Sequence, residues 1–422
     1  MPELVALDLP GGAGFVDTLR AVWDTGDAAA PLDPRLPRAA RAALLAALRP
    51  SRVVASDGEH HVMAGGLPVE EGDAIVVATS GSSGQPKGVV LTHDALRASA
   101  LATSDRLGVD PARHAWLACL PLAHVGGLSV VTRALLTGTP LTVLPGFDAD
   151  VVEALGRAER ATHLSLVSSA LRRLDPALFT RILLGGSRPP GDLPPNVVVT
   201  YGMTETGSGV VYDGYPLDDV EVAIAHFDDG DDDDGDDDDD GDDDSDGWSS
   251  DGDDWSGGGG TGRTSERDEG TSGAGQILLR APMLLRCYRD GTTGRVLGPD
   301  GSKTWFATGD AGYVNAQGTL SVTGRMAEMI TTGGEKVWPD EVERVISSHG
   351  DVAEVAVWKR ADPEWGERVV AWVVPGDVLP KAEELKELVA STIAPWATPK
   401  EIVFTTELPR TPSGKIKRNE LR

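Results

Sequence analysis

The sequence predicts an α/β fold: a large N-terminal domain of α/β layers with mainly parallel sheets, followed by a small C-terminal α+β domain. Short apolar runs alternate with helical segments between residues 141 and 201, which is typical of parallel sheets. After residue 325 the pattern changes to two strands and two helices within about a hundred residues. The 422 residues are also enough for more than one domain. We therefore expect domains at 1–324 and 325–422.

The individual elements follow from apolar periodicity and from turn residues. The helix at about 37–48 carries an apolar stripe of Leu44, Leu45 and Leu48, and either Thr92 or Asp94 can cap the helix at 95–106. Further helices are expected at about 149–160, 168–174, 340–348 and 380–394. Strands are expected at 52–55, 74–78, 114–120, 141–144, 162–167, 180–184, 197–201, 276–280, 304–306, 320–322, 352–359 and 369–374.

The formal net charge of -28 is unevenly distributed along the chain. Residues 228–254 hold 18 aspartates and no lysine or arginine, which leaves -10 for everything else. A run of Asp and Gly cannot bury apolar surface, so we expect a disordered Asp/Gly-rich insertion at about 226–272. Its spacing lacks a twelfth-position glutamate, which favours nonspecific cation condensation over a structured calcium site. Without a basic face, no nucleic-acid partner is expected.

The remaining composition suggests a cytoplasmic protein. Cys119 and Cys287 lie far apart and lack metal-ligand spacing, so we interpret them as core or incidental thiols. The N-terminus has no signal-peptide pattern. The apolar region 125–144 is interrupted by Arg133, Gly138 and Pro140, which argues against stable membrane insertion.

The segment at 79–88 follows an apolar strand and is rich in Gly, Ser and Thr. Convergent backbone N–H groups, hydroxyls and a lysine suit the phosphates of a nucleotide. It is not a Walker A loop, because Pro86 stands in place of the second glycine and Gly88 follows the lysine. The alternative is an ordinary surface loop. The candidate phosphate ligands are Thr79, Ser80, Gly81, Ser82, Ser83, Gly84 and Lys87.

Five other stretches combine residue types that suit a nucleotide site. A carboxylate such as Glu205 can bind magnesium, and Asp310, placed on an expected tight turn, can accept hydrogen bonds from a ribose diol. Each also has an ordinary explanation: His124 as a core histidine, Asp310 as a turn residue and Lys415 as surface charge. The stretches are 121–128, 201–206, 308–310, 325 together with 333–336, and 412–417.

The joint occurrence of these stretches, in this order, resembles the adenylate-forming superfamily of acyl-CoA synthetases, luciferases and peptide-synthetase adenylation domains. The resemblance spans essentially the whole chain except the acidic insertion. Within the superfamily the chain is most similar to the o-succinylbenzoate-CoA ligases of menaquinone biosynthesis. The segments that carry this similarity are 31–37, 162–167, 171–174, 200–217 and 331–339.

The resemblance implies an acid-thiol ligase that uses ATP, Mg²⁺ and CoA, passes through an acyl-adenylate, and has a mobile C-terminal lid. It implies that 79–87 holds the β- and γ-phosphates, that Thr204 contacts the α-phosphate, that Glu205 binds magnesium, and that Lys415 bridges the attacking carboxylate and the α-phosphate. The adenine would be framed by Gly185, Gly186, Ser187 and Tyr201, the ribose held by Asp310 and Arg325, and the CoA channel lined by His124, Gly333 and Gly334.

Some positions remain open. The family's hinge is usually Asp or Lys, but Ala327 stands there. Arg172 or Arg188 could meet a second substrate carboxylate or be surface arginines, while Met203, Ser208 and Gly209 would neighbour the acyl pocket. Two alternative functions are a ligase for another aryl or fatty acid and a noncatalytic acidic scaffold. The partners expected are a carboxylic acid, ATP and CoA, and a homodimer is left open.

Overall fold

The computed structural model describes residues 1–80, 86–186, 191–226, 274–410 and 416–421. Several predicted features lie outside these ranges and are not tested by the structure: Gly81, Ser82, Ser83, Gly84, Ser187, Arg188, Lys415 and the acidic insertion.

The first sheet has seven strands in the order β16-β6-β5-β2-β1-β3-β4. Its strands β1, β2, β3 and β5 are joined by parallel pairs, whereas β4, β6 and β16 are added antiparallel. The bounds are β1 Leu4–Leu7, β2 Ala28–Pro31, β3 Arg52–Val54, β4 His60–Val62, β5 Asp73–Ser80, β6 Pro86–Thr92 and β16 Cys287–Tyr288. Helices α1 (Ala13–Asp24) and α2 (Arg38–Leu48) accompany this sheet. The sequence prediction missed β1, α1 and β2. The two strands are runs of only four residues, which carry little periodic signal, and α1 begins without a side-chain cap.

The second sheet has the order β13-β12-β11-β10-β9-β7-β8, and its five strands from β11 to β8 are parallel, as predicted. The bounds are β7 Trp116–Ala118, β8 Leu141–Val143, β9 His163–Leu166, β10 Arg181–Leu184, β11 Val197–Gly202, β12 Gly209–Tyr212 and β13 Tyr215–Pro216. Helix α5 is Ala149–Arg157, and α6, Ser168–Leu171, is shorter than expected. The short turns η1 (Pro176–Leu178) and η2 (Thr204–Thr206) complete this region.

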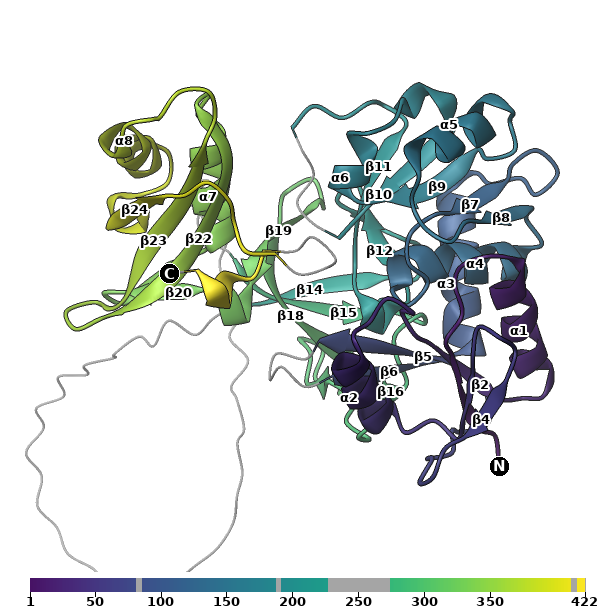
Figure 1. Ribbon diagram of the computed structural model, residues 1–422. Helices are drawn as coiled ribbons and strands as arrows, with labels where there is room; N and C mark the ends of the chain where they lie inside the picture. Colours follow the sequence, from purple (N-terminus) through teal and green to yellow (C-terminus); the bar gives the residue numbers. More distant parts are fainter. Residues whose placement is uncertain (81–85, 187–190, 227–273, 411–415, 422) are drawn as a thin grey trace, which may run out of the picture.

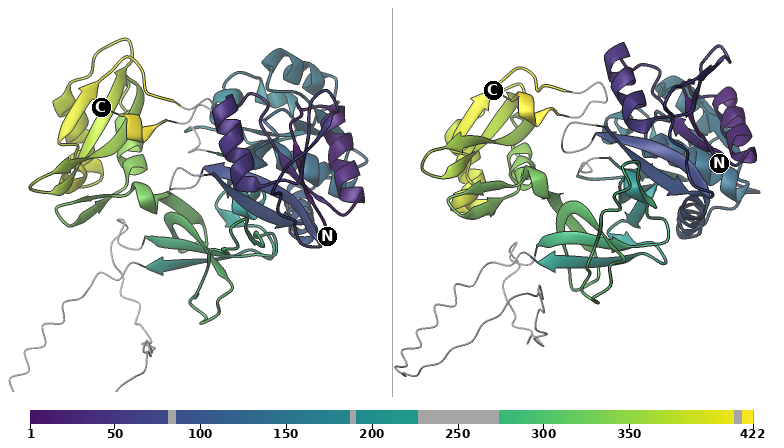
Figure 2. Two further views of the ribbon diagram at one scale, coloured as in Figure 1. Left: turned by 60° about the horizontal axis from the view of Figure 1, so that its bottom comes forward. Right: turned by 90° about the horizontal axis from the view of Figure 1, so that it is seen from below.

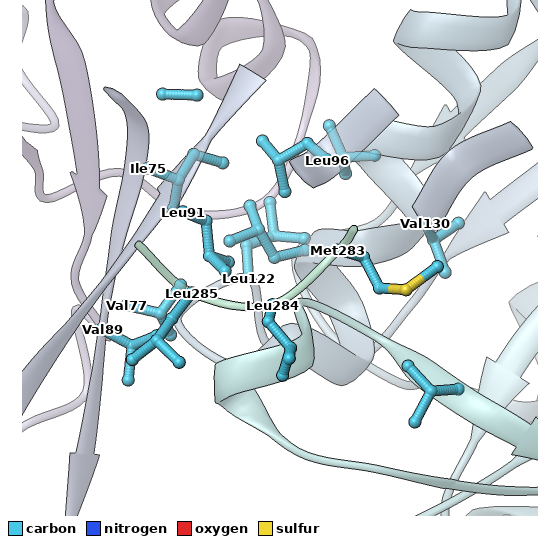
Figure 3. Packing of buried hydrophobic residues seen from close by; sticks show 14 of the residues in the cluster. Ile75, Val77, Val89, Leu91, Leu96, Leu122, Val130, Met283, Leu284 and Leu285 are labelled. Carbon is cyan, nitrogen blue, oxygen red and sulfur yellow. The ribbon is translucent and has the colours of Figure 1, made fainter. Parts of the chain in front are cut away.

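Helices α3 (His93–Leu107) and α4 (Val125–Thr137) pack on each other and connect the two sheets. Of the two predicted caps, Thr92 is the one found, since its side chain accepts a hydrogen bond from the Ala95 amide. The main hydrophobic cluster draws on both sheets, on both helices and on residues 283–285. Figure 3 shows the part of it formed by the first sheet, by α3 and α4, and by residues 283–285. Cys119 is buried, and burial raises the pKa of its thiol to about 12, which agrees with an inert core residue.

A third sheet is wholly antiparallel and follows the path β14-β15-β18-β17, with β19 paired to β18. The strands predicted at 276–280, 304–306 and 320–322 belong to it, but their pairing was not predicted. The bounds are β14 Glu221–His226, β15 Gly275–Arg280, β17 Arg295–Val296, β18 Trp305–Val314 and β19 Leu320–Arg325. The expected tight turn at 308–310 was wrong. These residues lie inside β18, where the register with β15 shifts and Gly309 has a φ of 72°.

The C-terminal part stands beside the rest, connected through β19 (Figures 1 and 2). Its sheet contains β20 Ile330–Thr332, β21 Glu335–Val337, β22 Val352–Asp362, β23 Gly366–Pro375 and β24 Glu401–Phe404. Helices α7 (Pro339–Ser347) and α8 (Ala382–Thr392) cover it and share a hydrophobic cluster with it. Short turns are η3 Met326–Glu328, η4 Pro395–Ala397 and η5 Arg418–Glu420.

The domain boundary at 324/325 stays a prediction. Within the described ranges, none of the helices is long and apolar enough to cross a membrane.

Candidate active site

Three of the predicted nucleotide-binding residues meet at the junction of the second and third sheets. The Tyr201 hydroxyl donates a 2.9 Å hydrogen bond to Asp310 Oδ2, and Arg325 Nε lies 2.8 Å from Asp310 Oδ1. Asp310 is 5% exposed, and its burial raises the pKa of the carboxyl while the Arg325 guanidinium opposes the rise. Burial, reinforced by the Asp310 charge, raises the pKa of the Tyr201 hydroxyl. The carboxylate is therefore held in one orientation by partners on two different strands.

The irregularity in β18 is what orients this carboxylate. Gly309 takes up a left-handed backbone conformation that residues with a Cβ rarely adopt. The Thr308 hydroxyl donates to the Ile277 carbonyl at 2.8 Å and accepts from the Asp310 amide at 3.0 Å. The bulge is thus closed by its own side chain, and Asp310 projects toward Tyr201 rather than following the normal alternation of the strand.

Gly185 and Gly186 lie next to this group, at the carboxyl end of β10 beside β11. A Cβ on Gly185 would stand 2.9 Å from Thr200 Oγ1, and Gly186 has a φ of 85°. The chain therefore turns closely past the residue that precedes Tyr201. Parallel sheets bind ligands at this edge, which is where the predicted adenine site falls.

Thr204 and Glu205 form the turn η2 immediately after β11. The turn is fixed from within, because the Met203 amide donates to Thr206 Oγ1 at 3.0 Å, and that hydroxyl lies 2.6 Å from the Ser208 carbonyl. The Leu285 amide bonds to the Glu205 carbonyl at 2.7 Å. The Tyr288 hydroxyl donates to Glu205 Oε1 at 2.9 Å.

Tyr288 also connects Glu205 with the predicted phosphate loop. Lys87 Nζ lies 5.3 Å from the centroid of the Tyr288 ring. Lys87 belongs to β6 rather than to a loop, and Thr79 is its direct partner on antiparallel β5. Directly opposed residues project on the same face of a sheet. The structure thus brings Thr79, Lys87 and Glu205 into one neighbourhood, with Tyr288 as a link that the sequence prediction missed.

The remaining predicted residues lie outside these two groups of contacts. His124 directly precedes α4 and is exposed, so the alternative of a core histidine was wrong. It lies near Asp33, whose pKa is lowered mainly by hydrogen bonds from Arg35 and in small part by His124. Gly333 and Gly334 form the exposed turn of the β20–β21 hairpin, both with positive φ as two-residue hairpin turns require. Ala327 lies exposed in η3.

Arg133 on α4 is the most unusual charged residue near the site. It is 1% exposed, its Nη2 donates to Ser208 Oγ at 2.8 Å, and its guanidinium lies 4.7 Å from the Trp116 ring centroid. Its Nε and Nη1 have no hydrogen-bond partner among the described residues. Burial lowers its pKa, and none of the described carboxylates pairs with it. In the sequence, Arg133 stands out as the only charged residue of the apolar region 125–144.

His163 and Trp116 extend this polar group inside the apolar core. The two rings lie 5.2 Å apart, and His163 Nε2 and Trp116 Nε1 also lack partners among the described residues. Burial, with smaller contributions from nearby cationic groups, lowers the pKa of His163 to about 4. The imidazole is therefore neutral, and Arg133 carries the charge of the group.

Comparison with known proteins shows which families this sequence resembles. Residues 68–232 match the AMP-binding enzyme family, and residues 341–415 match the AMP-binding enzyme C-terminal domain. A probable 2-succinylbenzoate–CoA ligase of Mycobacterium tuberculosis is 32% identical over 397 residues, 87% of this chain and 90% of that protein. A 2-succinylbenzoate–CoA ligase of Listeria monocytogenes is 31% identical over 83% of this chain and 69% of its own length.

Solved structures show the same fold. The o-succinylbenzoate-CoA synthetase of Bacillus subtilis, in complex with its acyl-adenylate intermediate, superimposes with a TM-score of 0.76 at 25% identity, covering 100% of this chain and 88% of that one. An amide bond synthetase of Marinactinospora thermotolerans gives a TM-score of 0.77 at 24% identity and is similar in fold.

Proposed function

The chain belongs to the AMP-binding enzyme family of acyl-CoA ligases, and from this premise we propose that it converts o-succinylbenzoate to o-succinylbenzoyl-CoA. ATP would activate the acid as an acyl-adenylate with release of pyrophosphate, and the thiol of CoA would then displace AMP. Support for the acid comes from relatives that carry this activity in their names, with identities of 30% or more over most of the chain. The similarity to the Bacillus subtilis o-succinylbenzoate-CoA synthetase, solved with its acyl-adenylate, supports the same acid.

Catalysis of the first half-reaction is a problem of charge, because an anionic carboxylate must approach an anionic α-phosphate. Enzymes that transfer phosphoryl groups or nucleotides solve it by positioning and electrostatic neutralisation. We assign the cationic groups to Lys87, on the β5–β6 hairpin, and to Lys415, near the C-terminus. Thr204 would donate a hydrogen bond to the α-phosphate. The Asp310 carboxylate, fixed by Tyr201 and Arg325, would accept hydrogen bonds from the ribose hydroxyls.

The Glu205 carboxylate is the candidate ligand for a magnesium ion that would bind together with ATP. Magnesium is usually held by one or two carboxylates together with substrate phosphates, not by a cage of protein ligands. Within the described ranges no group of three or more His, Cys, Asp or Glu side chains forms such a cage. Glu205 Oε1 accepts a hydrogen bond from Tyr288, which fixes the carboxylate beside Lys87. A bound magnesium would neutralise part of the charge on the phosphates.

The observation that carries the choice of acid is Arg133. o-Succinylbenzoate has two carboxylates, and only one of them reacts. A second carboxylate needs a cation that is not already neutralised, and Arg133 has two nitrogen atoms without partners among the described residues. Arg133 lies on α4, the helix that begins directly after His124. It donates to Ser208, which comes three positions after Glu205. By contrast, Arg172 is exposed. We therefore assign recognition of the second carboxylate to Arg133.

Release of pyrophosphate, measured over a panel of acids, tests the proposal. The panel would contain o-succinylbenzoate, benzoate, a medium-chain fatty acid and the two monomethyl esters of o-succinylbenzoate. We expect o-succinylbenzoate to give the highest kcat/KM, the ester of the reacting carboxylate to be inert, and the ester of the second carboxylate to be a poor substrate. Release with other acids only would make the chain a ligase of different specificity, and no release with any acid would favour the noncatalytic scaffold.

Lys415→Ala tests the division between the half-reactions. Adenylation should fall by at least about a hundredfold, because the lysine acts where charge accumulates in the transition state. Thioester formation from supplied acyl-adenylate should remain within about threefold of the original rate, since that step does not need this cation. Equal loss of both rates would refute the assigned role.

A further inference from the structure

We propose that Arg418 is a positioning residue for adenylation: by pairing with three carboxylates it holds the chain that carries Lys415 to the hinge segment and to α7. This inference rests on the proposed function, because it assumes that Lys415 serves the adenylation step. Its basis is the arrangement of the described residues on either side of the interval 411–415.

Arg418 lies in η5 and contacts two elements far from it in the sequence. Its Nη1 is 2.6 Å from Glu328 Oε2, and its Nη2 is 2.7 Å from Asp340 Oδ1 and 3.0 Å from both oxygens of Glu343. Its side chain is only 19% exposed. Glu328 is the residue after Ala327, the predicted hinge, and Asp340 and Glu343 lie on α7. One guanidinium thus joins the hinge segment, α7 and the C-terminal segment.

The other contacts of the C-terminal segment hold both flanks of the interval. Arg410 and Ile416 form a β-bridge, and the Lys417 amide donates to the Pro409 carbonyl at 2.8 Å. Leu408, Ile416 and Leu421 pack on the cluster that contains Trp372. Lys415 is the neighbour of Ile416, and Arg418 is only three positions after it. The described residues directly before and after the interval 411–415 are therefore held by contacts within the C-terminal part.

The charges explain why arginine is suited to this position. Three carboxylates surround one cation, and burial raises the pKa of Glu343 to about 7 despite the opposing Arg418 charge. Removal of Arg418 would take away the cation that the three acids share, and leaving the buried Glu343 carboxylate without it is far more costly than the loss of an exposed ion pair. A lysine has the charge but not the planar fork that reaches several acceptors at once.

The cluster also adjoins the ribose site. Asp340 lies near enough to Asp310 to contribute to its raised pKa, after burial and against Arg325. A Cβ on Gly324, in β19, would meet Trp338 and Asp340 within 3.6 Å. The same helix end that binds Arg418 therefore packs against the strand that supplies Arg325. Through this contact the position of the C-terminal segment is coupled to the nucleotide site.

The experiment compares Arg418→Gln and Arg418→Lys with Lys381→Gln in the full-length protein. Lys381 is the control, because it is a basic residue of the same C-terminal part whose described ion pair, with Glu384, is exposed. Adenylation is measured as ATP–pyrophosphate exchange with o-succinylbenzoate, and thioester formation is measured from supplied acyl-adenylate. We expect Arg418→Gln to lower exchange at least tenfold and thioester formation less than threefold. Arg418→Lys should recover part of the exchange, and Lys381→Gln should retain both rates.

A second measurement separates positioning from a general loss of structure. In the Lys415→Ala background, Arg418→Gln should lower the residual exchange no further, because its effect passes through Lys415. A further tenfold loss in that background, an equal fall of both half-reactions, or unchanged exchange in Arg418→Gln would each overturn the inference. If the unsubstituted protein exchanges pyrophosphate with none of the acids, the proposed function itself fails, which is a different result.

Discussion

Two arginines, Arg133 and Arg418, show how differently the two parts of the molecule use a cation. Arg133 is 1% exposed, lies over the Trp116 ring and has one described side-chain hydrogen-bond acceptor, the neutral Ser208 hydroxyl. Arg418 is partly exposed and has three carboxylates around it. Burial lowers the pKa of Arg133, whereas the carboxylates raise the pKa of Arg418 against the effect of burial. One site has an excess of positive charge and the other an excess of negative charge.

The difference suggests different purposes. A buried charge without a counter-charge is expensive, so it persists where a ligand supplies the missing partner. A cation surrounded by acids of its own chain is already satisfied and serves to connect segments. Arg133 thus has the character of a substrate-binding group, and Arg418 that of an internal anchor. The following substitutions test this distinction, in order of decreasing effect.

Replacing Arg133 by Met should have the largest effect. It preserves an elongated apolar side chain but removes the only charge of the group, so kcat/KM for o-succinylbenzoate should fall about a hundredfold or more, in line with the 2–5 kcal/mol of a buried charged contact. KM for ATP should change little. Steady-state kinetics, with o-succinylbenzoate and ATP varied in turn, measure both parameters. A similar loss in the exposed Arg172→Met variant, with Arg133→Met unaffected, would transfer the role to Arg172.

Glu343→Gln should have a smaller, pH-dependent effect on stability. Burial raises the pKa of Glu343 from its usual 4.5 to about 7, so between these values the folded protein binds a proton that the unfolded chain has released. The free energy of unfolding therefore falls as the pH rises from about 4.5 to about 7, by up to about 3 kcal/mol for this group. The glutamine variant should show a flatter profile in urea unfolding between pH 5 and 7. An identical profile in both proteins would contradict the assignment.

Ser208→Ala should have the smallest effect. It removes the hydroxyl that accepts from Arg133 Nη2, and a hydrogen bond to a charged group contributes about 1.5–3 kcal/mol. The unfolding free energy should fall by that amount, and the melting temperature with it. Ser391→Ala, which removes a hydroxyl on the exposed face of α8, is the control and should change the unfolding free energy by less than about 0.5 kcal/mol. Equal effects of the two substitutions would show that Arg133 does not depend on Ser208.

The sequence was informative where a pattern was long or chemically distinctive. Helices such as α2, α3 and α7 and the parallel strands of the second sheet were predicted from periodicity and caps. The predicted residues Tyr201, Asp310 and Arg325 meet in space, although more than a hundred positions separate the first from the others. The β18 bulge could not be predicted, because Thr308-Gly309-Asp310 reads locally as a turn and only the pairing with β15 makes it a strand.

Tyr288 and Arg133 could not be assigned for a related reason. Tyr288 acts through contacts with Lys87 and Glu205, which lie far away in the chain. Arg133 was visible only as an interruption of an apolar region, and a helix pattern does not tell whether such a charge turns outward or inward. Both assignments depend on tertiary packing, which no local window of the sequence contains.

The place at which the acidic insertion enters the fold has a practical consequence. His226 and Gly275 are paired neighbours on β14 and β15, so the chain leaves and returns at adjacent points of one sheet edge. The entropy of closing such a connection grows only with the logarithm of its length. The length and composition of this connection are therefore nearly decoupled from folding. This makes it a natural position at which to insert a reporter domain.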